Sequence, residues 1–354
     1  MPQTCRRVTP LAAIDYCLDL LRHAGVPADD AATVASCLVR ADLRGVNTHG
    51  ITRMQIYMER LAGGFINARP NMAVSQPTPV VGHIDGDDAF GFVVAKRAMD
   101  EAMKMAESFG IGMVGANRSS HYGMAAAYIL QAAEAGFISF AFSNAPAAMP
   151  AWGGRAPLLG TSPFAAGAPA GEGAAPFVVD FSPAITTRGA IRRAIRHGQT
   201  LSPGLALDKE GRPTTDPQAA FDGVVLPMGG PKGSALAMLM DVMSGVFTGA
   251  GFAGGVGDLF GGDRPQDVGH FFMAMKPGLF VSGEDFRARM ETLVRTVHDQ
   301  PRAEGVDEVL MPGERGARCE ETYRREGIPF ADEDIALLQE TARIYGTTPL
   351  ALLP

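Results

Sequence analysis

The chain has 354 residues, about the length of two average domains. Its 31 lysines and arginines stand against 38 aspartates and glutamates, giving a net charge of −7. This balance excludes the basic surface expected of a nucleic-acid-binding protein. Charged residues at 19% and hydrophobic residues at 46% exclude a disordered chain. The composition therefore indicates a globular protein with a large buried core.

The cysteines and the apolar stretches bear on the compartment. The 4 cysteines are widely spaced and form no Cys-x-x-Cys pair, which indicates neither a disulfide framework nor a zinc knuckle. Asp15 and Asp19 interrupt the region where a signal-peptide core would lie. The least polar stretch, Ser234–Phe260, contains two aspartates and several glycines, so we expect a buried helix followed by a glycine-rich loop. We therefore expect a cytoplasmic protein with no membrane partner.

The N-terminal segment is expected to be helical. Apolar residues at three- and four-residue spacing predict a first helix that stops at Gly25, and they are Leu11, Ile14, Leu18 and Leu21. A second helix is predicted from Pro27 to Gly45, with Val34, Leu38, Val39 and Ala41 facing inward. A third is predicted from Thr48 to Gly63.

Strand and helix patterns then alternate, which predicts an α/β fold. Strands are expected at 79–86, 112–116, 137–142 and 177–181, and helices at 95–109, 121–135, 232–250, 282–300 and 331–345. A Gly/Pro/Ala-rich loop is expected over 145–176, long enough to suggest a functional role. We expect an N-terminal helical segment, 1–75, to pack with C-terminal helices from 282–354, around an α/β cofactor-binding core at 76–281.

The first candidate for chemistry is the segment 47–57. On a continuous helix, His49, Arg53 and Tyr57 would lie on one face at i, i+4 and i+8. The arginine can hold a carboxylate in a bidentate contact, the histidine can exchange a proton near neutral pH, and the tyrosine can orient the substrate. Alternatively, these are incidental polar groups on a solvent-facing helix.

The second candidate is the segment 117–123, between a strand and a helix. A serine at the helix N-cap would place His121 in the first turn, where the helix dipole favours a neutral imidazole. Such an imidazole can accept a proton or bond to a cofactor. The alternative is a surface histidine beside a capping box.

Two glycine-rich segments resemble phosphate-binding loops but fail their tests. Gly110–Gly115 matches Gly-x-Gly-x-x-Gly, yet a helix precedes it and a strand follows, the reverse of the dinucleotide fingerprint. Gly229–Ser234 lacks the P-loop spacing, although Lys232 at a helix start can still meet an anion. The histidines and cysteines show no metal-ligand spacing, so no metal site is expected.

A further helix start follows the strand that ends at Asp180. This carboxylate can accept hydrogen bonds from ribose hydroxyls, and the arginines that follow could favour a phosphorylated ribose. Alternatively, Arg192, Arg193 and Arg196 form a solvated basic face.

Five blocks together resemble the malate/L-lactate dehydrogenase family of the type 2 kind, which includes sulfolactate, ureidoglycolate and diketogulonate dehydrogenases and cyclic-imine reductases. The resemblance runs from about residue 10 to 345. Its blocks are Arg44–Ile51, Ser119–Gly123, Pro150–Arg155 with Leu159–Pro163, Gly229–Gly233 and Val268–Phe272.

This resemblance implies an NAD- or NADP-dependent oxidoreductase with a non-Rossmann α/β fold, and a homodimer with its active site close to the subunit interface. It implies that His49 is the acid/base, that Arg53 anchors the substrate carboxylate, and that Thr48 is a polar neighbour. His121 is the other candidate proton acceptor, beside the nicotinamide. Thr161 is expected to touch substrate or cofactor. Further cofactor contacts are expected at Tyr122, Gly123, Asn144, Asp180, Phe181, Ser182, Lys232, Gly313 and Glu314.

The resulting hypothesis is hydride transfer between NAD(P)H and a small 2-oxo acid. Reduction of a cyclic imino acid is the alternative within redox chemistry, and a ureidoglycolate- or sulfolactate-type dehydrogenase is another. Two alternatives from other classes are a metal-assisted hydrolase or lyase using His49, His121 and Asp180, and a catalytically silent dimer. The sequence leaves open the substrate's side chain, NAD against NADP, the preferred direction and the choice of acid between the two histidines.

Overall fold

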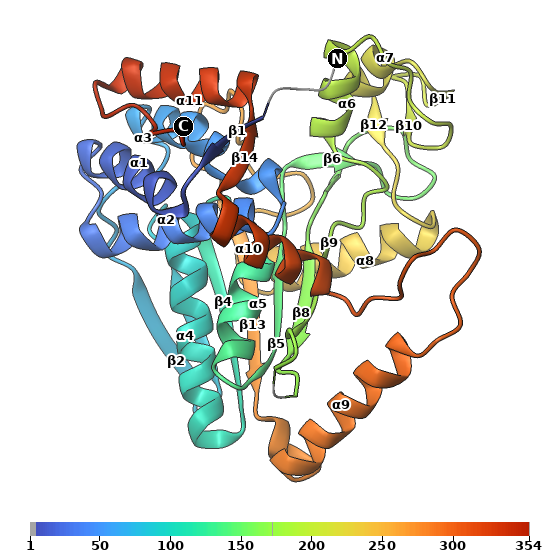
Figure 1. Ribbon diagram of the computed structural model, residues 1–354. Helices are drawn as coiled ribbons and strands as arrows, with labels where there is room; N and C mark the ends of the chain where they lie inside the picture. The colour runs from blue at the N-terminus through green and yellow to red at the C-terminus, as the bar shows by residue number, and fades with distance from the viewer. Residues whose placement is uncertain (1–4, 172, 354) are drawn as a thin grey trace.

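A computed structural model describes residues 5–171 and 173–353, and its centre is a seven-stranded sheet (Figure 1). Neighbouring strands are antiparallel except β3 and β4, which run parallel. Buried and half-buried residues alternate along β4 and β5, as expected when the two faces of a sheet are covered differently. The α/β prediction is confirmed. In spatial order the strands are β2 (Ala73–Thr78), β3 (Val81–Asp85), β4 (Ile111–Ser119), β13 (Val268–Met275), β5 (Ile138–Ser143), β8 (Phe164–Ala168) and β9 (Phe177–Phe181).

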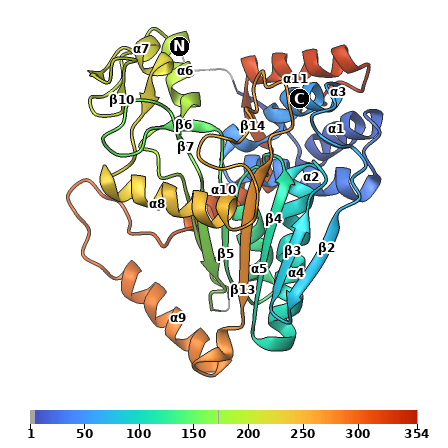
Figure 2. The ribbon, with the colours of Figure 1, turned by 180° about the vertical axis from the view of Figure 1, so that it is seen from behind.

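Helices cover both faces of the sheet. On one face lie α4 (Gly91–Phe109) and α5 (Ala126–Glu134), and on the other lies α8 (Pro231–Asp241) with the π-helical turn Val242–Val246 (Figures 1 and 2). Small residues allow α4 to approach closely: a Cβ at Gly112 of β4 would lie 2.2 Å from the carbonyl oxygen of Ala102. The chain order α4 then β4 also confirms that Gly110–Gly115 is not a dinucleotide fingerprint.

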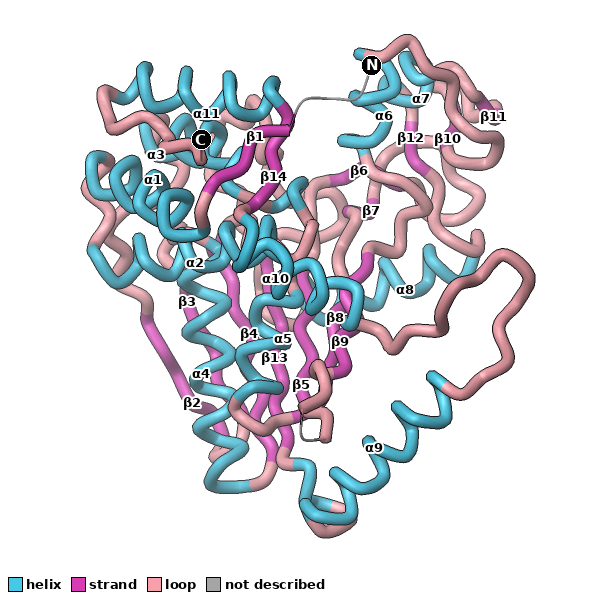
Figure 3. The backbone as a smooth tube through the Cα atoms, in the orientation of Figure 1, coloured by secondary structure: helices cyan, strands magenta, loops and turns pink. Residues whose placement is uncertain are grey.

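The N- and C-terminal segments meet in a helical lobe beside one end of the sheet (Figure 1). Its elements share one apolar core, and β1 pairs with β14 antiparallel. The C-terminal helix α11 contributes to this core, whereas α9 (Gly283–His298), which we expected to pack there as well, projects from the body and has no buried residue. An extended loop, 299–313, leads from α9 to α10 (Glu314–Glu326), which contacts α2 (Figure 3). The lobe consists of β1 (Cys5–Val8), α1 (Pro10–His23), α2 (Ala28–Leu43), 3₁₀ turns at Asn47–His49 and Ile51–Arg53, α3 (Met54–Ala62), β14 (Ile328–Ala331) and α11 (Asp332–Tyr345).

A smaller lobe stands on the opposite side and has a core of its own (Figure 1). It contains α6 (Arg188–Arg196), α7 (Pro217–Asp222), β10 (Ala206–Leu207), β11 (Pro213–Thr214) and β12 (Val224–Val225), with β6 (Ala147–Met149) and β7 (Leu159–Gly160) beneath it. The predicted loop 145–176 thus contains β6, β7 and the sheet strand β8. That strand reads Phe-Ala-Ala-Gly-Ala and lacks the β-branched residues that mark strands in a sequence.

The prediction of a buried helix at 232–250 is wrong for one face of that segment, which is exposed. α8 ends at Asp241, the π turn follows, and five large apolar side chains stay exposed, including Phe247 at 66%. The others are Met238, Leu239, Val242 and Val246. Across the described residues, no helix combines the length and apolar character that a membrane span requires.

Candidate active site

A cavity of about 520 Å³ opens at one edge of the sheet, where β4, β5 and β9 end and β8 and β13 begin. Its volume lies in the range of small-molecule and cofactor sites. The 3₁₀ turn at Asn47–His49 and the first turn of α10 close it from the helical side. Predicted site residues that line it are Thr48, His49, His121, Tyr122, Gly123, Asn144, Thr161, Asp180, Phe181, Ser182 and Gly313.

Two imidazoles form the chemical centre of this cavity. The rings of His49 and His121 are stacked, with centroids 5.5 Å apart and an interplanar angle of 20°. Burial and then the charge of Arg53 lower the pKa of His49 to about 4. Burial, followed by His49 and Arg53, holds the pKa of His121 well below its ordinary value. Although both rings touch the open cavity, surrounding protein atoms desolvate them, so both are neutral at pH 7.

The His121 ring is held by a buried tyrosine. Its Nδ1 lies 2.7 Å from the hydroxyl of Tyr57, and its backbone N–H donates to Oε1 of Gln266 at 3.0 Å. The expectation that His121 lies in the first turn of a helix is wrong, because α5 begins only at Ala126. Burial, rather than a helix dipole, therefore keeps the imidazole neutral. The sequence analysis did not identify Gln266, a buried polar residue in the glycine-rich loop between the π turn and β13.

The segment 47–57 is not one continuous helix, so the predicted single face is wrong. Gly50 interrupts it, and a Cβ there would lie 1.8 Å from Oδ1 of Asp42. The buried Asp42 carboxylate accepts a hydrogen bond from the backbone N–H of Ile51 at 2.8 Å, which fixes this break. Tyr57 lies on α3 and is fully buried. It therefore supports His121 instead of lining the cavity.

Arg53 faces a neighbouring cavity of about 720 Å³ rather than the one that the histidines line. Thr48 lines both cavities, and its carbonyl oxygen accepts a hydrogen bond from Nε of Arg53 at 2.7 Å. The Thr48 hydroxyl lies 3.0 Å from Nδ1 of His49. A ligand at the junction of the two cavities would thus meet both the guanidinium and the imidazoles.

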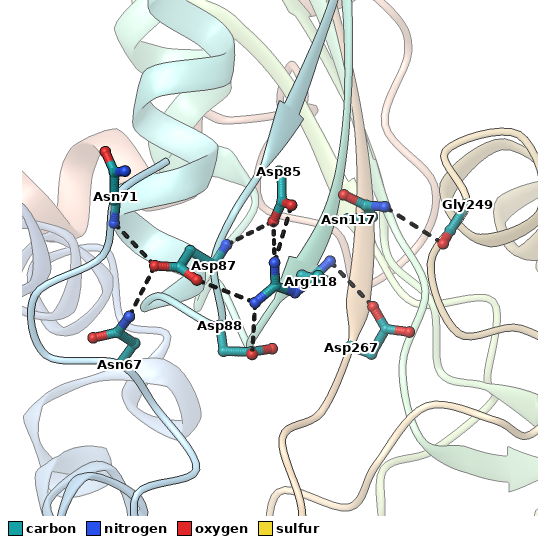
Figure 4. A network of polar contacts seen from close by, with 9 residues as sticks. All are labelled: Asn67, Asn71, Asp85, Asp87, Asp88, Asn117, Arg118, Gly249 and Asp267. Atoms are coloured by element: carbon teal, nitrogen blue, oxygen red, sulfur yellow. Dashed lines mark hydrogen bonds and ion pairs between the residues drawn. The ribbon is translucent and has the colours of Figure 1, made fainter. Parts of the chain in front are cut away.

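A strained polar network precedes His121 in the chain (Figure 4). The Arg118 guanidinium contacts the carboxylates of Asp85, Asp87 and Asp88 at 3.0–3.3 Å, and its backbone N–H donates to Asp267 at 3.1 Å. Arg118, Asp87, Asp88 and Asp267 all have positive φ angles, which non-glycine residues rarely adopt. The network joins the ends of β3 and β4 to the start of β13, and so fixes the backbone that leads to His121.

A third histidine is buried behind the cavity wall. His270 bridges the hydroxyls of Ser119 at 2.8 Å and Ser143 at 3.0 Å, and its ring stacks on Tyr122 at 4.7 Å. Burial lowers its pKa to about 3. Both ring nitrogens are engaged, so His270 supports Tyr122 and is not a candidate for proton exchange with a ligand.

The opposite wall carries the predicted cofactor contacts. Asp180 accepts a hydrogen bond from the backbone N–H of Ala126 at 2.8 Å, at the start of α5, and desolvation raises its pKa to about 6. The hydroxyl of Ser182 donates to the Thr161 carbonyl at 2.7 Å. The Asn144 side chain is bonded to Gly251 and Gly269, and its backbone is bonded to Gly269 and to the Ser143 hydroxyl, so these bonds fix its position in the cavity wall.

Two observations fit this wall to a polar ligand. The Tyr122 hydroxyl is buried and has no hydrogen-bond partner among the described residues. Gly123 has a φ of +76°, and a Cβ there would lie 2.3 Å from Phe92, so only glycine allows this close turn beside the cavity. This wall therefore combines the Tyr122 hydroxyl, the Asp180 carboxylate and the close backbone turn at Gly123. Such a set of groups fits a nucleotide cofactor.

Two predicted contacts lie outside the cavity of the single chain. Lys232 does stand at the start of α8, but its side chain is exposed and lines no part of the cavity. Glu314 accepts a hydrogen bond from Met311 N–H, and its carboxylate lies 2.9 Å from Nε2 of His298. Arg44 and Arg315, which sequence reasoning missed, line the cavity instead. Within the described residues, no group of three His, Cys, Asp or Glu side chains is placed to hold a metal ion.

Fold and cavity define an α/β protein with a ligand site that holds two neutral imidazoles. A profile of the malate/L-lactate dehydrogenase family matches residues 8–339. The chain therefore belongs to the malate/L-lactate dehydrogenase family.

Known relatives are similar to this chain over most of its length. An L-sulfolactate dehydrogenase of Methanocaldococcus jannaschii is 35% identical over 84% of this chain and 85% of its own length. A structure of sulfolactate dehydrogenase from the same organism superposes with a TM-score of 0.90 at 33% identity, covering 97% of this chain and 98% of the other. The ureidoglycolate dehydrogenase (NAD(+)) of Escherichia coli is 33% identical over 93% of each chain. The structure of a delta1-piperideine-2-carboxylate reductase from Pseudomonas syringae has a TM-score of 0.85 at 28% identity, covering 95% of this chain and 100% of the other.

Proposed function

We propose that this protein is an NAD- or NADP-dependent oxidoreductase that interconverts a small 2-hydroxy acid and the corresponding 2-oxo acid. The observation that carries the proposal is the stacked, neutral pair His49 and His121, which lines a cofactor-sized cavity. Arg53 beside them supplies a fixed positive charge for the substrate carboxylate. Relatives named as dehydrogenases support the same reaction class.

The cofactor is assigned to the wall formed by Tyr122, Gly123, Thr161, Asp180 and Ser182. Asp180, which lines the cavity, would accept hydrogen bonds from ribose hydroxyls. When bound, the nicotinamide supplies or accepts the hydride. We propose that this is achieved without a Rossmann unit, since the sheet lacks the run of parallel strands that such a unit contains.

The proton is handled by the two histidines. In the alcohol-oxidising direction, a neutral imidazole can accept the hydroxyl proton directly, and both rings are neutral at pH 7. In the reducing direction the imidazole must first be protonated. Burial and, to a smaller extent, the charge of Arg53 lower the pKa of both histidines. A substrate carboxylate on Arg53 would offset the Arg53 contribution and would leave the larger contribution of burial in place.

An Arg53→Ala variant tests the anchor. We expect KM for 2-oxo acids to rise steeply and kcat/KM to fall. The loss of transition-state stabilisation should be about 2–4 kcal/mol, because a charge-assisted contact to the carboxylate is removed. NAD(P)H absorbance with a panel of 2-oxo acids and both reduced cofactors gives the measurement. Arg193→Ala, an exposed arginine of α6, is the control. Near-normal kinetics in Arg53→Ala would contradict the assignment.

Separate His49→Gln and His121→Gln variants identify the proton donor. Single-turnover reduction, followed at several pH values, should lose the chemical step in the variant of the true acid. In the other variant, cofactor or substrate affinity should change instead. If both variants keep the chemical step, neither histidine has the proposed role.

Reduction of a cyclic imino acid is the second candidate, favoured by the similarity to the Pseudomonas syringae reductase structure. The same Arg53 anchor would serve, and the imine nitrogen would replace the carbonyl oxygen. Side-by-side assays with pyruvate, oxaloacetate and a cyclic ketimine separate the two reactions.

A homodimer with the active site near its interface is also proposed. The exposed apolar side chains on α8 and the following π turn support it, because a contiguous apolar face of this kind is normally covered by a partner. A Phe247→Glu change should convert a dimer into a monomer in analytical ultracentrifugation, and a monomeric wild-type protein would contradict the proposal.

We further propose a cytoplasmic location, supported by cysteines that are free throughout the described residues.

A further inference from the structure

The cavity that Arg53 faces lies between α3, α11 and the small lobe, and it adjoins the histidine cavity at Thr48. Its volume is about 720 Å³. Arg53 enters it from the helical lobe, and Arg192 enters it from α6 of the small lobe. Two guanidinium groups from separate lobes thus share one space next to the proposed reaction centre.

Phe260, in the loop that follows the π turn, contacts both of these arginines. The Cζ atoms of Arg53 and Arg192 lie 5.1 Å and 4.9 Å from the centre of its ring, so they are no more than about 10 Å apart. Contact with an aromatic ring leaves guanidinium N–H groups available for an anion. The ring therefore contacts two cationic groups in one small region and does not neutralise them.

Neither guanidinium has a carboxylate partner among the described residues. Arg53 donates to the Thr48 carbonyl, and Arg192 contacts the rings of Phe221 and Phe260. By contrast, the nearby Arg196 lies 3.9 Å from Glu333. Glu59 and Asp334 also line the cavity, but neither is within ion-pair distance of Arg53 or Arg192. Two unpaired like charges held this close repel one another, and an anion between them removes that repulsion.

The upper limit of about 10 Å between the two Cζ atoms admits one ligand with two anionic groups. Charge-assisted N–H···O contacts are about 2.8 Å long, and adding one at each end of a four-carbon diacid gives a span of roughly 10 Å. A three-carbon acid with one carboxylate reaches Arg53 but leaves Arg192 without a partner. The second guanidinium therefore discriminates between these two kinds of substrate.

We propose that Arg192 binds the second anionic group of the substrate, so that the enzyme selects dianionic 2-oxo and 2-hydroxy acids over monoanionic ones. The second group is a carboxylate or a sulfonate on the carbon next to the reacting centre. The inference rests on the proposed function, since it assigns one end of that function's substrate. Arg53 holds the carboxylate beside the reacting carbon, and Arg192 decides which side chain is accepted.

The test compares kcat/KM for pyruvate, oxaloacetate and 3-sulfopyruvate in the full-length wild type, Arg192→Gln, Arg192→Lys and Arg193→Gln. For the two dianions, Arg192→Gln should lose about 10- to 100-fold, mainly through KM, because one charge-assisted contact is removed. For pyruvate the change should stay within about threefold. Arg192→Lys keeps the charge and should recover part of the loss, and Arg193→Gln should match the wild type. The two dianions show whether carboxylate or sulfonate is preferred.

Several results would overturn the inference. Equal losses for pyruvate and the dianions would show that Arg192 acts on the fold or on Arg53, and circular dichroism would separate these causes. Unchanged dianion kinetics in Arg192→Gln, or a wild type that prefers pyruvate, would also refute it. A wild type that reduces none of the three acids with either cofactor would instead refute the proposed function itself.

Discussion

Replacing Tyr57 by phenylalanine isolates the contact that holds His121. The tyrosine is fully buried, and its hydroxyl lies 2.7 Å from Nδ1 of the imidazole. The substitution removes one oxygen and leaves that nitrogen without its partner. Because a buried hydrogen bond contributes about 0.5–1.5 kcal/mol, the free energy of unfolding should fall by about 1 kcal/mol.

The effect on the reaction should be larger than a change in stability alone explains. Tyr57 fixes both the orientation of the His121 ring and the nitrogen that carries the proton. Without it, the imidazole samples both tautomers and other rotamers. We expect kcat to fall about tenfold, equivalent to about 1.4 kcal/mol, with little change in KM, because Tyr57 does not contact the substrate.

Tyr16 offers a matched control. Its hydroxyl is also buried and donates to the Leu338 carbonyl at 2.8 Å, but it lies in the helical lobe away from the cavity. Tyr16→Phe should lose about the same free energy of unfolding in urea titrations and keep its kcat. The reasoning is refuted if Tyr57→Phe keeps kcat within about twofold, or if Tyr16→Phe loses kcat to the same extent.

Three further perturbations test other parts of the structure. Burial lowers the pKa of His270 to about 3, so this imidazole takes up a proton between pH 7 and pH 5 only in the unfolded chain. Over that interval the free energy of unfolding of the wild type should fall by about 2 kcal/mol more than that of His270→Gln. Equal losses in the two proteins would contradict this. Gly50→Ala places a Cβ 1.8 Å from Asp42 and should cost about 2 kcal/mol or more in chemical denaturation, whereas Gly283→Ala, with nothing within 4 Å, should be near neutral. Arg118→Ala leaves three carboxylates facing one another and should cost about 1 kcal/mol at low salt and less at about 0.5 M NaCl, so a loss independent of salt would argue against charge repulsion.

Local patterns in the sequence predicted those elements whose periodicity is strong. The helix predicted from Pro27 carries Val34, Leu38, Val39 and Ala41 inward, and all four are buried in α2. β8 was missed, because alanine and glycine give no strand signal and its place in the sheet depends on pairing with β5 and β9. The exposed face of α8 was also missed, since an apolar helix at a partner surface has the same composition as one in a core.

The site was predictable as a set of residues but not as a geometry. Helical spacing identified His49, Arg53 and Tyr57, and the segment 117–123 separately identified His121. The family resemblance then implied roles for His49, Arg53 and His121. The break at Gly50 could not be inferred, because it depends on the buried carboxylate of Asp42. A local pattern likewise cannot show that Gln266, distant in the chain, bonds to the backbone of His121.

The division of the site between lobes has a consequence for how specificity can change. His121 and Tyr57 are fixed by buried contacts between the sheet and the helical lobe, so substitutions around them disturb packing as well as proton transfer. Arg192 and Phe260 instead sit on exposed parts of α6 and the glycine-rich loop, where a change of side chain opens no cavity in the core. If Arg192 binds the second anionic group, a substitution at this position should change which substrate side chain is bound and leave the imidazole pair in place. Replacement of Arg192 is therefore the expected route from an anionic to a neutral substrate side chain, with the contact between His121 and Tyr57 unchanged.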